Sequence, residues 1–147
     1  MSRAFVKEDD GDAEVVVKPP QRTHPYYVTP EGYERLQQQL ASAQTAGDAR
    51  IAEAVQERIS AAVVVRPEDQ PAELARFGAA VTVQSPDGKK TAYRIVGEDE
   101  ADPLQGRISW LSPLAQALLE HRAGDRVVWQ RPAGNMPLKI VSISYAP

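Results

Sequence analysis

The spacing of apolar and polar residues divides the chain into stretches that predict different structures. Residues 1–25 show no sustained period and combine acids with prolines. This composition predicts a disordered tail, because it buries too little apolar area to offset the entropy of ordering. Its Val15–Val17 run is an alternative element, either an edge strand or a contact with a partner. Residues 26–63 space their apolar positions three and four apart, as helices do. After a proline-containing linker at 64–75, residues 76–147 alternate in short runs between turn residues, as strands do.

Two antiparallel helices are predicted within residues 26–63. Thr29 before Pro30 is typical of a helix start, because the threonine hydroxyl accepts a first-turn N–H and proline lacks the N–H that would stay unpaired. Gly47 predicts the left-handed residue that ends the first helix, and Asp48 predicts the N-cap of the second. At 1.5 Å per residue each helix is about 25 Å long, so the pair forms a short hairpin. The apolar seams are Tyr33, Leu36, Leu40 and Ala43 on the first helix, and Ile51, Val55, Ile59 and Ala62 on the second.

Residues 76–147 predict a strongly bent antiparallel sheet with one helix packed against it. Two alternating runs flank the turn at 85–88, where Asp87-Gly88 supplies the positive backbone angles of a hairpin. Ser112 predicts a helix cap and Pro113 the first helical residue. The inward face of that helix is Leu114, Ala117 and Leu118. The predicted fold class is therefore α+β, with a short antiparallel helical hairpin followed by a bent sheet carrying one helix.

Composition narrows the classes of function. The 147 residues contain no cysteine, which excludes disulfides and thiolate metal sites. No apolar run approaches the roughly 18 residues of a membrane span, and the first residues lack a secretory signal, so we expect a cytoplasmic protein without membrane contacts. At a net charge of -3, nothing global attracts nucleic acid, and a role near DNA or RNA would run through a protein partner. His24 and His121 lie far apart in unlike contexts, and we expect no catalytic residue, metal or cofactor.

The acid-rich run from Glu98 to Asp102 is the most conspicuous candidate for chemistry. Its Asp-Glu-Ala-Asp letters match a helicase signature, but the phosphate-cradling loop is missing because Val83 stands where its first glycine belongs before Gly88-Lys89. A calcium loop is disfavoured because the run lacks alternating ligands with a central glycine and a closing glutamate. Runs of acids in loops are usually solvated. We therefore interpret the run as a solvated turn, with metal binding as the alternative.

Three segments together closely resemble the GreA/GreB family of bacterial transcript cleavage factors. They are YVTPEGYERLQQQL at 27–40, RFGAAVTV at 76–83 and RIVGEDEADPLQGRISWLSPLAQALLEHRAGDRVVW at 94–129. The resemblance implies a C-terminal domain similar in fold to FKBP-type prolyl isomerases, without their activity. It also implies docking on bacterial RNA polymerase near the secondary channel, with the hairpin inserted toward the catalytic centre. In the family, acids at the hairpin tip hold a magnesium ion and a water, and the polymerase itself cleaves backtracked RNA, so the factor is not an enzyme.

This chain departs from the family at the hairpin tip. The family hairpin is about two dozen residues longer, so each helix here is shorter by roughly 18 Å at 1.5 Å per residue. Asp48 keeps its place in the family's tip motif, but Ile51 replaces the first glutamate and Glu53 is out of register. The shortened hairpin, with IAEAV at 51–55, is also similar to Rnk, a Gre-related protein described as a regulator of nucleoside diphosphate kinase. We therefore predict little or no stimulation of cleavage. The alternative is an active factor in which Asp48 and Glu53 help to place magnesium.

The docking loop is better preserved than the tip. Ser112 and Pro113 match the Ser-Pro of the family, whereas Leu111 replaces an acid found in some members. The resemblance therefore implies that Ser112 and Pro113 contact RNA polymerase. Nucleic acid would be met only within the polymerase complex. The resemblance thus implies a transcription elongation regulator that docks near the secondary channel.

Overall fold

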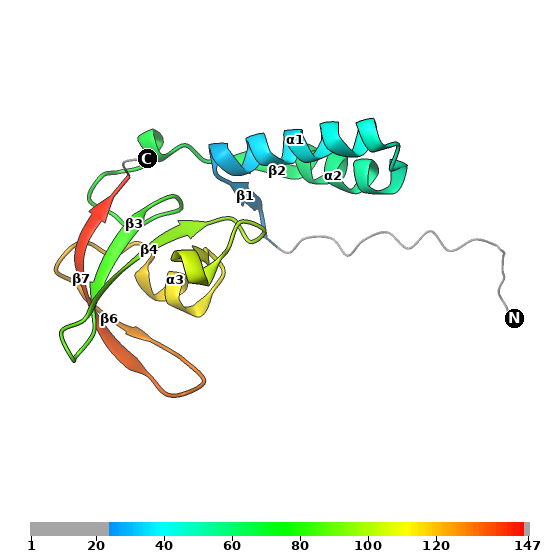
Figure 1. Cartoon of the computed structure of the whole chain (residues 1–147). Helices are drawn as coiled ribbons and strands as arrows, with labels where there is room; N and C mark the ends of the chain where they lie inside the picture. Colours follow the sequence, from blue (N-terminus) through cyan, green and yellow to red (C-terminus); the bar gives the residue numbers. More distant parts are fainter. Residues whose placement is uncertain (1–23, 146–147) are drawn as a thin grey trace, which may run out of the picture.

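The structure is a computed structural model that describes residues 24–145. The predicted tail at 1–25 therefore lies outside the described residues, except for His24 and Pro25. A helical hairpin lies over one end of a curled sheet, and the hairpin points away from the sheet (Figure 1). No helix within residues 24–145 has the length and apolar character needed to cross a bilayer.

The hairpin forms where the capping residues predict it. Helix α1, Pro30–Ala46, begins after Thr29, whose side chain accepts the N–H of Gly32 at 3.0 Å. It ends at Gly47, which is left-handed with φ 74° and whose position favours glycine. Helix α2, Ala49–Ala61, is capped by Asp48. The predicted start, turn and second cap are confirmed.

A small parallel sheet closes the base of the hairpin. Strand β1, Tyr26–Val28, pairs with β2, Ala62–Val64, which directly follows α2. The sequence prediction missed both strands, because three residues are too few to show a period of two. Together with the helices they bury a first core of Tyr26, Val28, Leu36 and Val55. The connector that follows contains a short 3₁₀ turn, η1, Pro67–Asp69.

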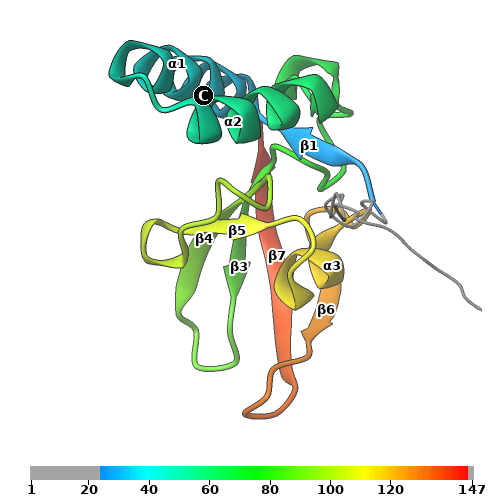
Figure 2. The ribbon, with the colours of Figure 1, turned by 90° about the vertical axis from the view of Figure 1, so that its right-hand side faces the viewer.

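The larger sheet has five strands and is curled around a short helix (Figure 2). Its strands are β3 Ala80–Gln84, β4 Lys90–Val96, β5 Arg107–Ser109, β6 Arg126–Trp129 and β7 Met136–Ser144. They lie in the order β5-β4-β3-β7-β6. Neighbours are antiparallel except β5, which runs parallel to β4. The α+β class is confirmed, and the sheet is mixed because a loop containing η2, Pro103–Gln105, brings the chain back before β5 begins.

Helix α3, Pro113–Leu118, fills the concave side of the curl and completes the second core. Leu114, Ala115 and Leu118 are its buried residues. Ala117, predicted on this face, is partly buried and packs against the core, and Ala115, which the prediction did not include, is fully buried. The sheet contributes the remaining large members of this core: Val81, Val83, Ile95, Ile108, Val127, Leu138 and Ile140.

Candidate functional site

The acidic loop between β4 and β5 joins the sheet to the hairpin. The Glu100 carboxylate accepts hydrogen bonds from the backbone N–H groups of Thr29 and Gly97, each at 3.0 Å. It also accepts the hydroxyl of Thr29. That hydroxyl in turn accepts the N–H of Gly32 in the first turn of α1. We call Glu100, Thr29, Gly32 and Gly97 the carboxylate junction. In it, one side chain from the loop after β4 holds the start of α1 through hydrogen bonds. Below, the sheet module means the larger sheet with α3 and its loops.

Two glycines make room for this carboxylate. A Cβ on Gly97 would lie 2.5 Å from the carbonyl oxygen of Tyr27 and 2.6 Å from Oε2 of Glu100. A Cβ on Gly32 would overlap the same carboxylate. Gly97 requires glycine for space, because a backbone oxygen stands in the way, whereas a Cβ on Gly32 would force the Glu100 carboxylate to move. The close approach of β1 to the acidic loop therefore depends on the absence of a side chain at Gly97.

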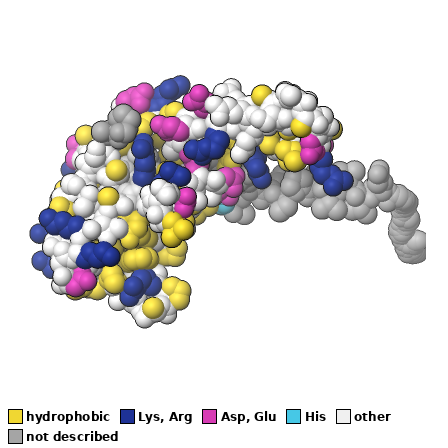
Figure 3. Space-filling view, viewed as in Figure 1, with side chains coloured by type: hydrophobic (Ala, Val, Ile, Leu, Met, Phe, Trp, Pro, Cys, Tyr) yellow, Lys and Arg dark blue, Asp and Glu magenta, His cyan; other side chains and the backbone are white. Residues whose placement is uncertain are grey.

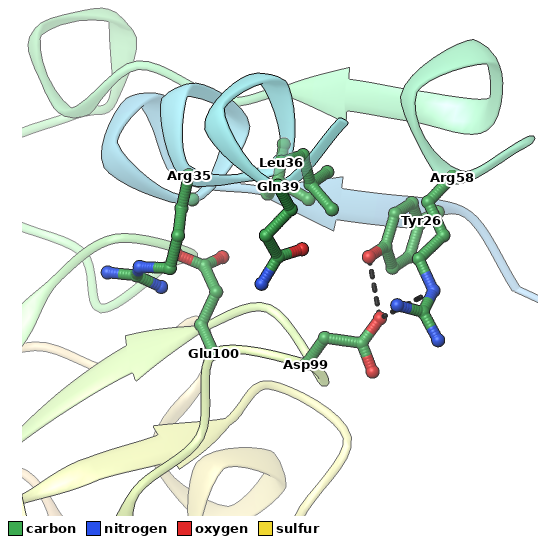
Figure 4. Close-up of a pocket in the computed structure, with 9 residues that line it drawn as sticks. Tyr26, Arg35, Leu36, Gln39, Arg58, Asp99 and Glu100 are labelled. Atoms are coloured by element: carbon green, nitrogen blue, oxygen red, sulfur yellow. Dashed lines mark hydrogen bonds and ion pairs between the residues drawn. The ribbon is translucent and has the colours of Figure 1, made fainter. Parts of the chain in front are cut away.

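Asp99 makes the second connection to the hairpin, next to a pocket of about 230 Å³. It accepts the Tyr26 hydroxyl at 2.6 Å, and its Oδ2 lies 3.9 Å from Nε of Arg58 on α2. Figure 4 shows Asp99 with Tyr26 and Arg58 at one end of the pocket, and Glu100 near Arg35 at the other. The carboxylates face donors and cations from the hairpin. Their arrangement can fix the hairpin's direction relative to the sheet.

The run forms a turn in which Asp99 is exposed, as interpreted, but Glu100 is not simply solvated because Thr29 and Gly97 hold its carboxylate. Both side chains hold residues about 70 positions earlier in the chain. The outer acids have local or weaker partners: Asp102 lies 3.8 Å from Arg107, and Glu98 lies 3.5 Å from the His24 ring. Sequence patterns report only on residues that are close along the chain. They therefore predicted the cap at Thr29 but not the hydrogen bond from Thr29 to the distant Glu100.

The predicted docking residues lie in a turn held by its own hydrogen bonds. Ser112 caps α3 by accepting the N–H of Ala115 at 3.2 Å, and its hydroxyl donates to the carbonyl of Ser109 at 2.7 Å. Pro113 is the first residue of the helix and is exposed. Leu111 beside them has 36% of its surface exposed. We call residues 111–113 the docking loop. It presents an apolar edge on a fixed backbone, and contact with a polymerase stays a prediction.

Aromatic side chains connect the docking loop to the hairpin base. Trp110, immediately before the loop, lies 5.0 Å from the ring of Tyr27 on β1. Tyr27 lies 5.7 Å from Phe77, and both pairs are within the range of favourable ring contacts. The backbone carbonyl of Trp110 accepts the side-chain amide of Gln116 on α3 at 2.7 Å. The docking loop, β1 and α3 are therefore packed as one unit.

The predicted tip residues, Asp48 and Glu53, are both exposed at the far end of the hairpin. The Asp48 carboxylate accepts the N–H of Ile51 at 3.1 Å and so serves as a helix cap. Glu53 lies five positions after the Asp48 cap, and at about 100° per residue the two side chains point to different sides of the hairpin. Within the described part of the chain, no group of three or more His, Cys, Asp or Glu residues could hold a metal ion.

A short helical hairpin fixed to a curled sheet, with a rigid exposed loop before α3, defines the class as a two-part α+β module. The family model described as "Transcription elongation factor, GreA/GreB, C-term" matches residues 70–145, more than half of the chain. The chain belongs to the GreA/GreB family of transcription elongation factors.

The curated relatives that match are named as GreA or GreB factors. The chain is 45% identical over 89 residues to transcription elongation factor GreB of Neisseria meningitidis serogroup B, covering 60% of this chain and 55% of that protein. It is 42% identical over 83 residues to GreA of Geobacillus kaustophilus, covering 56% and 52%. The chain thus spans about half the length of the curated relatives it matches. Among solved structures it is similar to GreA factor homolog 1 (Gfh1) of Thermus thermophilus, with 25% identity, a TM-score of 0.45, and coverage of 82% of this chain and 99% of that one.

Proposed function

We propose that this chain is an elongation regulator that binds bacterial RNA polymerase through its docking loop, near the secondary channel. Its relatives are named transcription elongation factors, and the family match covers the whole sheet module. The rigid turn at Ser112 and the exposed edge of Leu111 and Pro113 support a protein-docking role. The chain itself carries out no chemistry in this proposal, and it meets nucleic acid only within the polymerase complex.

We further propose that binding gives little or no stimulation of transcript cleavage. The observation that carries this step is the hairpin tip. The α1 helix has 17 residues, about 25 Å, and the one tip acid that keeps its family position is engaged in capping α2. Holding a magnesium ion requires several converging oxygen ligands. A single capping carboxylate offers too few ligands for the ion. On a short hairpin, this carboxylate would also remain far from the catalytic centre of the polymerase.

Docking is tested by equilibrium binding of the full chain to core RNA polymerase. The wild-type chain is compared with a variant that carries a substitution in the docking loop. Leu111→Arg places a charge on the apolar edge and is expected to weaken binding about tenfold or more, since a hot-spot contact exceeds 1.4 kcal/mol. Leu104→Arg is the matched control, because Leu104 is 96% exposed and lies outside the docking loop. Wild-type chain that does not bind, or equal effects of the two changes, would contradict docking through this loop.

Cleavage is tested on stalled, backtracked complexes with a labelled transcript. The chain alone is expected to release no short 3′ fragments above the polymerase background, whereas a full-length GreB should release them. If fragments do appear with this chain, the same assay on the Asp48→Ala and Glu53→Ala variants shows whether those carboxylates contribute to cleavage. Loss of cleavage in either variant would favour the alternative of an active factor.

A further inference from the structure

Another pocket, of about 160 Å³, lies between the start of α1 and the β5 edge of the larger sheet. Three arginines line it: Arg35 from α1, Arg94 from β4 and Arg107 from β5. Figure 4 shows Arg35 extending from α1 toward the sheet module, beside Glu100. In Figure 3, Lys and Arg side chains gather where the hairpin meets the sheet module. We call this pocket the arginine pocket, and it lies outside the docking loop.

The guanidinium group of Arg94 carries a donor that the protein leaves unbonded. Its Nη2 is buried and has no hydrogen-bond partner in the part of the chain that the structure describes. Within residues 24–145, neither Arg94 nor Arg35 forms an ion pair. Buried donors are nearly always paired in folded proteins, and leaving a charged donor unpaired is costly. Arg94 is therefore placed to bind an acceptor that residues 24–145 do not supply.

Two of these arginines are neighbours on adjacent strands. Arg94 and Arg107 are partners in the parallel β4–β5 ladder, and both line the pocket. Like charges at facing positions of neighbouring strands destabilise a sheet. Arg107 is only weakly held, because its closest approach to Asp102 is 3.8 Å and 42% of its side chain is exposed. An anion between the two guanidinium groups would replace this repulsion by attraction.

Two acids in the lining limit the charge and size of a ligand. Glu31 and Glu100 line the pocket together with the three arginines, which leaves an excess of one positive charge. The Glu100 carboxylate is already bonded to Thr29 and Gly97, and Glu31 is exposed. One excess charge favours a small anion over a nucleic acid strand, whose binding requires many phosphate contacts. The volume of about 160 Å³ equals roughly five waters at about 30 Å³ each, which accommodates a single phosphate group.

We propose that the arginine pocket binds the phosphate group of a small ligand, either free phosphate or a nucleotide. Arg94 donates to it from the buried Nη2, and Arg35 and Arg107 bind its remaining oxygens. Guanidinium groups suit this role because they donate paired N–H bonds to phosphate oxygens. Arg35 belongs to the hairpin and the other two arginines to the sheet, so the bound phosphate connects the two parts of the molecule. This proposal does not depend on polymerase binding.

The test is a titration of the full chain with inorganic phosphate, followed through the backbone amide signals. Saturable shifts are expected at Arg94 and Arg107, beyond any change that sodium chloride causes at the same ionic strength. Arg94→Gln should weaken phosphate binding about tenfold or more, because it removes a charged pair of donors. Arg35→Gln, at an exposed helix position, should also weaken it. Arg50→Gln is the matched control and should bind as wild type, because Arg50 is exposed on α2 and does not line the pocket.

A parallel titration with adenosine monophosphate distinguishes the two sources of the phosphate. Tighter binding than inorganic phosphate, with the same loss in Arg94→Gln, would support a nucleotide, and equal binding would support free phosphate. Unchanged amide signals in the core strands confirm in each variant that the fold is intact.

Three results would overturn the proposal. Shifts that do not saturate, or that sodium chloride reproduces, would show ionic screening alone. Equal binding by wild type, Arg94→Gln and Arg35→Gln would place the phosphate elsewhere on the chain. A single-stranded oligonucleotide whose affinity rises with its length, without binding of either small phosphate compound, would assign these arginines to a nucleic acid surface.

Discussion

Replacing Glu100 with alanine removes the acceptor at the centre of the carboxylate junction. Thr29 is 3% exposed and Gly97 is buried, so their N–H groups would lose an acceptor in places that water reaches poorly. Each such loss costs about 1–3 kcal/mol. Water entering the space that the side chain leaves offsets a part of this. We therefore expect Glu100→Ala to lower the free energy of unfolding by about 3 kcal/mol.

Urea unfolding measures this loss, and the melting temperature should fall by about 12 °C, taking roughly 4 °C per kcal/mol for a protein of this size. Glu34→Ala is the matched control, because Glu34 is exposed on α1 and its replacement should stay within about 0.5 kcal/mol of wild type. Glu100→Gln keeps one oxygen acceptor, so its loss of unfolding free energy should lie between those of Glu100→Ala and Glu34→Ala. Amide exchange at Thr29 and Gly32 should accelerate in Glu100→Ala. If Glu100→Ala costs no more than Glu34→Ala, the carboxylate junction does not stabilise the fold.

Two further changes test the carboxylate junction and a third tests the cap at Asp125. Gly97→Ala should lower the free energy of unfolding by about 2 kcal/mol or more, because its Cβ would strike the Tyr27 carbonyl; a neutral result would refute the close approach. Thr29→Val loses both the cap and its donation to Glu100, and should cost about 1–2 kcal/mol in urea unfolding, whereas Thr29→Ser should restore most of this. The Arg122 N–H donates to Asp125 and holds the pKa of that carboxyl below its usual range. A depressed pKa gives stability that is present above the unfolded pKa of about 3.9 and is lost as pH falls through the lower folded value. Asp125→Asn should therefore flatten the acid limb of a stability-against-pH curve below about pH 4, and an unchanged limb would contradict this assignment.

The elements that the sequence predicts well are those whose cause is local. Thr29-Pro30, Gly47 and Asp48 determine the limits of the two helices through bonds that span three or four residues. Ser112 and its following proline do the same for α3. Binary patterning likewise reveals most strands of the larger sheet, because one face of each is buried.

The elements that the sequence did not reveal depend on distant partners. The β1–β2 sheet brings Tyr26 beside Ala62, and the parallel β5 takes its place only after a loop returns the chain to β4. The carboxylate junction joins positions 71 residues apart. A single sequence carries no signal for such a pairing, so the acids at Asp99 and Glu100 look like any solvated loop. At the candidate site, the sequence predicted the Ser112 and Asp48 caps but not the attachment of the hairpin to the acidic loop.

The most direct test of the proposed function is a competition for backtracked polymerase. Stalled complexes with a labelled transcript receive a limiting amount of full-length GreB, and the release of 3′ fragments is followed as this chain is added. A docking factor with a short hairpin and a single capping acid at its tip should release no fragments alone, and it should suppress GreB-dependent release as it occupies the polymerase. Fragment release by the chain alone, or GreB-dependent release that the chain leaves unchanged at saturating concentration, would contradict the proposal.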